Sequence, residues 1–192
     1  MKRFWQKPLL PGSDPNRDFE QRMLGQRQIL IGQAIDDECA NAVIAKLLFL
    51  NMTDASRPIT VFIDSPGGSI TATLAIFDTI LFVGAPVHTW VTGRANGGAL
   101  WLFAAGAAGS RFVMKESILT IEPVQVLEDQ ASDTAMVSKL MEDMASKLAS
   151  RSRMSGSEVL GYLQSRGRAF TAEEAIERGI ADHLSDSYPV WG

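Results

Sequence analysis

The sequence is poor in residues that bind metals or form disulfides. Its 192 residues include one cysteine, Cys39, and two histidines, His88 and His183. A lone cysteine excludes an intramolecular disulfide framework and a multi-cysteine zinc site. Two histidines leave little material for metal binding or for histidine-based catalysis. We therefore expect neither a metal ion nor a cofactor, and we expect both histidines to be structural or surface residues.

Long apolar runs and an excess of basic residues are also missing. No stretch has the roughly 18 uninterrupted apolar residues of a membrane span, and no apolar segment follows the basic start, so we expect no signal peptide either. Eighteen basic and 22 acidic residues give a net charge of −4, which argues against a nucleic-acid or anionic-membrane partner. The 46% of apolar and 21% of charged residues are typical of a globular chain, which we expect in the cytoplasm.

Prolines and charges set the first 17 residues apart from the rest. Residues 1–17 have no periodic apolar pattern, and we predict an irregular arm there. Residues 18–192 are predicted to form a single domain. At this length a folded chain buries roughly 70% of the surface that its unfolded form exposes, so the core needs no disulfides.

Apolar strand patterns alternate with helix patterns in the first two thirds of the domain. We predict strands at four short apolar or β-branched runs: 29–31, 59–63, 87–91 and 118–121. Helical spacing predicts three helices between them: 37–48, 71–83 and 99–105. Glycine-rich turns at 65–69 and 93–98 lead from a strand into a helix. This order predicts an α/β fold with parallel strands and right-handed crossover helices.

The pattern changes after residue 128. Apolar residues then recur every four positions and predict a long amphipathic helix at about 130–150, with the stripe Met136, Leu140, Met144 and Leu148. A short helix is predicted at 158–164. The capping box Thr171–Glu174 predicts another helix, which ends at Gly179. Residues 180–184 are predicted to return as a last strand.

The two glycine-rich turns are candidates for a binding site. They follow successive parallel strands, and ligands of open α/β sheets bind at the carboxyl ends of the strands. Backbone amides at such turns can stabilise an oxyanion or a phosphate. Alternatively, the glycines only permit tight turns and close packing of helix on strand. Neither turn matches a G-x-G-x-x-G or G-x-x-x-x-G-K-[ST] pattern, so nucleotide binding is not expected.

Several of these segments together resemble the proteolytic subunit of the Clp protease, the ClpP family. The resemblance covers about residues 18–184 and lies in six segments: Asp64–Ala72, Ala75–Ile80, Ile35–Asn41, Leu47–Leu50, Ala104–Phe112 and Thr171–Gly179. It implies a crotonase-like α/β spiral fold with a protruding handle helix at about 130–150. It also implies heptameric rings that stack in pairs, as a tetradecamer, around a chamber fed by an ATP-dependent unfoldase.

The same resemblance assigns the positions of the family's catalytic triad. The serine position is Gly97, the histidine position is Glu122 and the aspartate position is Gly167. A serine protease needs a nucleophile, a histidine base and an orienting carboxylate, so the chain resembles the family's non-catalytic members, called ClpR. We expect no active catalytic residue. Gly68 and Gly98 match the family's oxyanion-hole amides.

The resemblance also implies partners. We expect a homo- or hetero-oligomeric ring with an active Clp proteolytic subunit, with contacts from the stripe at 136–148 and from Arg166, which fits an inter-ring arginine. Residues 123–129 lack the family's glycine pair, so ring stacking is less expected than ring formation. Thr60 and Phe62 stand where tyrosines of the unfoldase-docking groove are common, and Trp90 is on the next strand, so docking is expected to be altered.

A second hypothesis remains open from the sequence. Crotonase-type enzymes hold an acyl-thioester enolate with backbone amides and use a glutamate as acid and base. Gly68, Gly98 and Glu122 provide these groups. Alternatively, the amides persist because the backbone turn persists, and Glu122 is only a polar residue at a pocket floor. The sequence shows no clear basic patch for the phosphates of coenzyme A.

Overall fold

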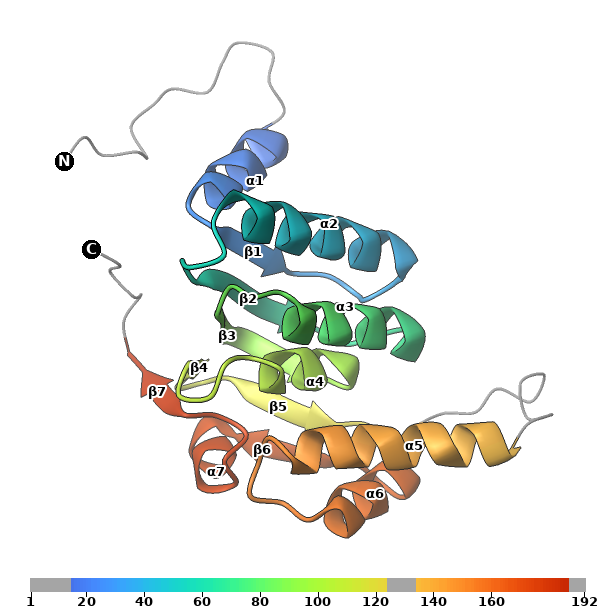
Figure 1. Ribbon diagram of the computed structural model, residues 1–192. Coiled ribbons are helices and arrows are strands. Elements are labelled where there is room, and N and C mark those ends of the chain that lie inside the picture. The colour runs from blue at the N-terminus through green and yellow to red at the C-terminus, as the bar shows by residue number, and fades with distance from the viewer. Residues whose placement is uncertain (1–14, 124–133, 187–192) are drawn as a thin grey trace.

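A seven-stranded sheet with helices packed against it forms the body of the molecule (Figure 1). The computed structural model describes residues 15–123 and 134–186. The strands are β1 Gln28–Ile31, β2 Ile59–Ser65, β3 Val87–Asn96, β4 Arg111–Met114, β5 Ile118–Ile121, β6 Arg168–Thr171 and β7 His183–Ser185. The helices are α1 Pro15–Gly25, α2 Asp37–Thr53, α3 Ile70–Phe82, α4 Gly98–Ala104, α5 Thr134–Ala149, α6 Gly156–Gln164 and α7 Ala172–Glu177. In these described parts of the chain, no helix combines the length and apolarity needed to span a bilayer.

The sheet is mostly parallel and divides at β3. Its main path runs in the order β1-β2-β3-β4-β7, with every pair parallel. The first half of β3 pairs with β4, and its second half, Arg94–Asn96, pairs with β5. β6 is antiparallel to β5. The parallel α/β fold predicted from the alternation of strands and helices is therefore confirmed, with β6 as the one antiparallel strand among the described residues.

All five predicted strands are present, but the boundaries of several elements differ from the expectation. β3 continues to Asn96, so most of the predicted glycine turn at 93–98 is strand. The extension pairs with β5, and Asp64 supports it, because its Oδ1 accepts a hydrogen bond from the Arg94 N–H at 3.1 Å. β4 and β6 were not predicted, and β7 begins at His183 rather than at residue 180. Helix α1 begins at Pro15, inside the predicted arm, and residues 1–14 lie outside the described residues.

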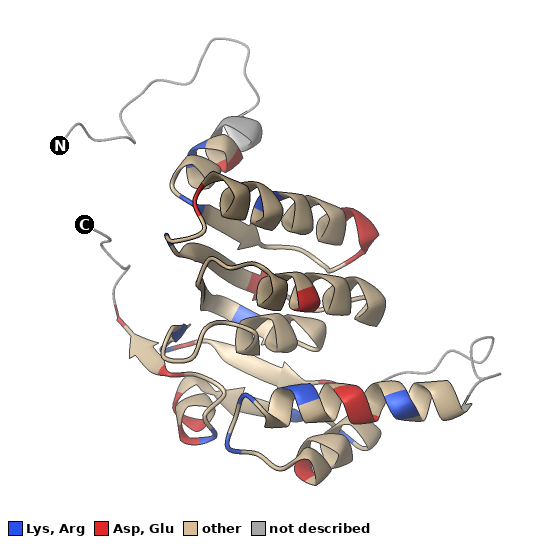
Figure 2. Ribbon diagram, viewed as in Figure 1, with Lys and Arg blue, Asp and Glu red and all other residues tan. Residues whose placement is uncertain are grey.

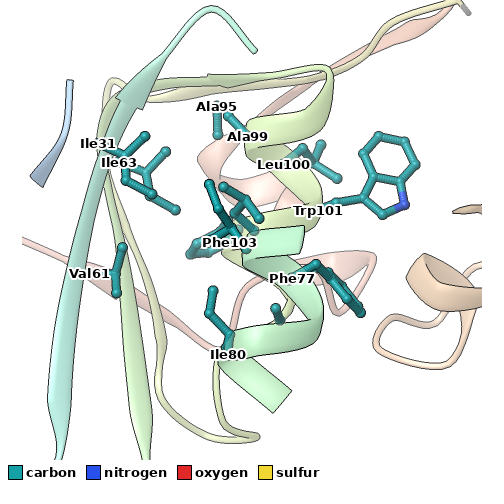
Figure 3. Close-up of a cluster of buried hydrophobic side chains, with 14 of the residues drawn as sticks. Ile31, Val61, Ile63, Phe77, Ile80, Ala95, Ala99, Leu100, Trp101 and Phe103 are labelled. Carbon is teal, nitrogen blue, oxygen red and sulfur yellow. The ribbon is translucent and has the colours of Figure 1, made fainter. Parts of the chain in front are cut away.

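The hydrophobic core lies between the sheet and helices α2, α3 and α4, which cover one of its faces (Figures 1 and 3). Val61, Ile63 and Ala95 of the strands contribute to the same cluster as Phe77 of α3 and Phe103 of α4. Every residue of α4 is buried. Burying a large apolar side chain contributes roughly 1.5–3 kcal/mol. Helix α4 is therefore held firmly, and so is the turn that precedes it.

Helix α5 is anchored at one end and extends beyond the sheet at the other (Figure 1). Met144 and Leu148 are 3% and 0% exposed within the chain's own core, and the indole Nε1 of Trp101 donates a hydrogen bond to the Met144 carbonyl at 2.9 Å. Met136 is 69% exposed and Leu140 is half-buried. The chain itself therefore covers Met144 and Leu148 of the predicted stripe, whereas Met136 and Leu140 keep exposed surface. The start of the predicted helix, residues 130–133, lies outside the described residues.

Candidate functional site

The candidate site is centred on the sharp turn between β3 and α4. Gly97 occupies this turn with φ 47° and ψ −127°, a conformation that side-chain-bearing residues rarely adopt. Its N–H donates to the Thr120 carbonyl at 2.9 Å, and its carbonyl accepts from the Leu100 N–H at 3.0 Å. A strained turn from strand to helix is the geometry that presents a nucleophile in many hydrolases. Here the turn has that geometry without a side chain to present.

Glu122 lies directly beside this turn. A Cβ atom placed on Gly97 would lie 2.9 Å from Oε2 of Glu122. The pairing of β5 with the end of β3 explains the proximity, because Thr120 is opposite Asn96 and Glu122 follows two residues later. Glu122 is exposed to solvent. Gly97 and Glu122, which the resemblance assigns to the serine and histidine positions, are therefore neighbours in space.

Gly167 completes the group from the other side of β5. It precedes β6, whose Arg168 is paired with Ile121. Its φ is 70°, and a Cβ atom there would contact the Ile121 carbonyl oxygen and lie 3.0 Å from Cδ of Pro123. The structure thus brings Gly167 next to both neighbours of Glu122. Glu122 alone among the three has a side chain that can react.

The two glycine turns meet at one edge of the sheet, as the sequence predicted. A Cβ atom on Gly67 would lie 3.3 Å from the backbone nitrogen of Gly98. Gly68 forms a bridge with Ile35, and a Cβ atom there would contact the Ile35 backbone. A Cβ atom on Gly98 would contact Oγ1 of Thr73. Both candidate oxyanion positions therefore also need glycine for close packing, which the alternative reading of the turns anticipated.

The two serines that flank the Pro-Gly-Gly turn and the two histidines lie in separate places and are not arranged as a triad. The buried Ser65 hydroxyl donates to the Gln33 carbonyl at 2.6 Å and accepts from the Gly67 N–H at 3.1 Å. Ser69 caps α3. His88 lies at the opposite end of β3 from Gly97, and burial lowers its pKa. His183 lies on β7 at the edge of the sheet, where it stacks on Phe112 with ring centroids 5.0 Å apart.

Asn96 is a residue of the site that the sequence analysis missed. It is the last residue of β3, directly before Gly97. Its Oδ1 is buried and has no hydrogen-bond partner among the described residues. The sequence signal that could have identified Asn96 is a polar residue directly before a pair of glycines.

Among the described residues, no cluster of histidine, cysteine, aspartate and glutamate could hold a metal ion.

The segment that contains these positions matches a known protein family. Residues 12–187 match the family model described as Clp protease, a range that contains Gly97, Glu122 and Gly167. The chain is also similar to the ATP-dependent Clp protease proteolytic subunit 2 of Streptomyces avermitilis. The two sequences are 35% identical over 179 residues, which cover 91% of this chain and 90% of that relative.

Proposed function

This chain belongs to the Clp protease family, and on that premise we propose that it is a ring-forming subunit of a Clp protease complex without peptidase activity of its own. Its mostly parallel α/β sheet agrees with the family fold. The observation that carries the proposal is the position of Gly97 and Gly167 on either side of β5, with Glu122 beside Gly97 and Gly167 beside the two neighbours of Glu122. At the positions that the resemblance assigns to the triad, glycine, glutamate and glycine stand in place of the nucleophile, the imidazole and the orienting carboxylate.

The chemistry of the site supports inactivity. Loss of triad members lowers turnover by about 10⁴ to 10⁶, because the nucleophile is no longer activated or is absent. Glycine at position 97 has no atom that can attack a carbonyl. The Glu122 carboxylate beside the turn would also repel the negative charge that develops on a tetrahedral intermediate.

A peptidase assay combined with active-site labelling tests the inactivity. We expect the purified chain to cleave no fluorogenic peptide and to react with no fluorophosphonate probe, while an active Clp proteolytic subunit treated in parallel does both. Stoichiometric labelling of any serine in the folded chain, lost on unfolding, would show that another residue has become the nucleophile.

The ring-forming role is supported by the exposed half of α5. Met136 is 69% exposed, and the half-buried Leu140 and Met141 follow on the projecting part of the helix. An amphipathic helix gains most of its stability by burying such a face. We propose that this segment, with the exposed Arg166, contacts other subunits in a heptameric ring that contains an active paralogue or stacks on a second ring.

Native mass spectrometry tests the assembly. The chain should form a heptamer or a multiple of it, either alone or after mixing with an active Clp proteolytic subunit. A persistent monomer in both samples would contradict the proposal. This result is independent of the peptidase assay, so inactivity and assembly can fail separately.

Docking of an ATP-dependent unfoldase is a further part of the proposal. Phe62, Trp90 and Phe112 form an aromatic cluster on adjacent strands, with the Trp90 and Phe112 rings stacked at 4.5 Å. Trp90 is 2% exposed and Phe62 is 6% exposed, so a docking loop would meet a surface with little accessible aromatic area. We therefore expect the chain to bind an unfoldase more weakly than an active subunit does, as measured by pull-down or by surface plasmon resonance.

One observation favours a second candidate function. The carboxylate of Glu122 adjoins the amide-bearing turn at Gly97, as an acid–base residue of a crotonase-type enzyme would. Its exposure to solvent favours the non-catalytic proposal instead. Acyl-coenzyme A would raise the melting temperature of such an enzyme, because a ligand at about 100 times its Kd adds roughly 2.7 kcal/mol of stability. No shift at millimolar ligand would exclude this candidate.

A further inference from the structure

A cavity lies at the opposite end of α4 from Gly97. It has a volume of about 590 Å³ and is bordered by the C-terminal end of α4, the loop from α5 to α6, α7 and β7. Three arginines contribute to its lining, Arg111, Arg151 and Arg153, and Asp182 is the one acidic residue of that lining. Figure 2 shows basic residues on the loop between α5 and α6. The cavity is therefore positively charged although the chain as a whole has a net charge of −4.

Asp182 already forms an ion pair with Arg111 of the same chain. Its carboxylate accepts hydrogen bonds from the Arg111 backbone N–H at 3.0 Å, from Nε at 2.9 Å and from Nη2 at 2.6 Å. Nη1 of Arg111 donates to the Arg151 carbonyl. Arg111 and Asp182 thus neutralise each other, and neither is available to balance the other two arginines.

Within the described parts of the chain, Arg151 and Arg153 donate only to backbone carbonyls. Nη1 of Arg151 donates to the carbonyls at the end of α4 at long distances, 3.5 Å to Ala104 and 3.3 Å to Ala105. Nη1 of Arg153 donates to the Glu177 carbonyl at 3.2 Å. No carboxylate of the described residues forms an ion pair with either guanidinium group. Burial, followed by the charge of Arg111, lowers the pKa of Arg151, as expected for a cation without a compensating anion.

We propose that this cavity binds a phosphate group through Arg151 and Arg153. The guanidinium group is planar and presents its N–H donors in a fork that matches the oxygens of a phosphate. Both arginines line the same cavity, which is where an anion would meet their remaining N–H donors. The volume is within the range of small-molecule sites, so the phosphate can be free or part of a small phosphomonoester.

Isothermal titration calorimetry of the full chain tests the site. Inorganic phosphate and phosphoserine are titrated at an ionic strength held constant with sodium chloride, because surface charges also attract anions non-specifically. We expect at least one of the two to bind. Tighter binding of phosphoserine would identify a phosphomonoester site, and equal or tighter binding of inorganic phosphate would identify a free-phosphate site.

Substitutions assign the binding to this cavity. A hydrogen bond to a charged group contributes about 1.5–3 kcal/mol, so Arg153→Gln and Arg151→Gln should each weaken binding by about tenfold or more. Arg94→Gln, an exposed arginine on β3 outside the cavity, removes the same charge and should leave the affinity unchanged. If the Arg151→Gln variant unfolds because Arg151 holds the end of α4, the affinity of Arg153→Gln alone tests whether the anion binds in this cavity.

Three results would overturn the proposal. The first is no heat of binding with either anion at millimolar concentration. The second is an equal loss of affinity in Arg153→Gln and Arg94→Gln, which would indicate general attraction of anions. The third is binding of succinate, a dicarboxylate, as tightly as either phosphate compound, which would show that the cavity does not recognise phosphate.

Discussion

The carboxylate of Glu122 fills the space beside Gly97 into which a nucleophilic side chain would extend. A Cβ atom on Gly97 would lie 2.9 Å from Glu122 Oε2, and this oxygen is the end of a flexible side chain. At Gly167 the obstacle is different, because a Cβ atom would contact the backbone carbonyl of Ile121. A side chain would therefore meet an obstacle at both glycines, but only the obstacle at Gly167 is rigid.

Substitution by alanine should lower the free energy of unfolding by different amounts at these two glycines. Both have positive φ, and such strain costs of order 1–3 kcal/mol. We expect Gly97→Ala to lower the free energy of unfolding by about this amount, and Gly167→Ala to lower it further because the backbone of β5 must move. Urea denaturation followed by circular dichroism measures both.

The control for this prediction is Glu122→Ala. Combined with Gly97→Ala, it should restore part of the lost free energy of unfolding. Combined with Gly167→Ala, it should restore none. Equal losses in the two single variants, unchanged by Glu122→Ala, would show that φ strain alone decides the stability at both positions.

Two buried tryptophans offer a matched pair of substitutions. Trp101 Nε1 donates to the Met144 carbonyl at 2.9 Å and links α4 to α5. Trp90 Nε1 is buried without a hydrogen-bond partner among the described residues. Trp101→Phe should lower the free energy of unfolding by about 1 kcal/mol more than Trp90→Phe does, because only the former loses a hydrogen bond.

Hydrogen exchange of the α5 amides provides the second measurement. Exchange near Met144 should accelerate in Trp101→Phe and stay unchanged in Trp90→Phe. An equal effect of both variants on stability and exchange would mean that lost ring packing, and not the Trp101 hydrogen bond, holds α5 at its base.

The sequence predicted those elements whose apolar pattern reflects the core. β2 and α4 are almost entirely buried, and apolar residues dominate both elements. β6 was missed because only Phe170 of its four residues is buried, and pairing with β5 defines the strand. The continuation of β3 past Gly93 also depends on a distant side chain, that of Asp64. Local sequence carries no signal for such contacts.

The site illustrates the same limit. The resemblance supplied positions 97, 122 and 167, but their convergence depends on the pairing of β5 with both β3 and β6. The four-residue spacing of the α5 stripe likewise predicted an amphipathic helix without showing what covers it. Met144 and Leu148 are covered by the chain itself, whereas Met136 is exposed. Sequence periodicity defines a face of the helix and not its partner.

Asp182 should make stability depend on acid pH. Burial tends to raise the pKa of Asp182, but the hydrogen bonds and the positive charge of Arg111 outweigh burial and hold the pKa below its ordinary value. A carboxylate with a lowered folded-state pKa stabilises the fold above its unfolded-state pKa, about 3.9 for aspartate. This contribution is lost as the pH falls through the folded-state pKa.

Asp182→Asn tests this dependence. It leaves Arg111, whose side chain is 9% exposed, without its anion, and should lower the free energy of unfolding near pH 7 by about 3 kcal/mol. The difference from the wild type should shrink as the pH falls below about 4. Asp78→Asn removes the exposed partner of Lys147 and should change stability by no more than about 1 kcal/mol. A pH-independent difference for Asp182→Asn would contradict the assignment.

The two halves of α5 should respond differently to an introduced charge. Met144 is 3% exposed, so Met144→Asp places a carboxylate in the core and should unfold the body. Met136 is 69% exposed, so Met136→Asp should leave the folded chain intact. In the proposed ring, Met136→Asp combined with Leu140→Asp places charges in a subunit contact and should reduce the oligomer to smaller species. Native mass spectrometry gives the size, and circular dichroism gives the melting temperature. An oligomer of unchanged size in the Met136→Asp, Leu140→Asp variant would show that the projecting half of α5 is not an interface.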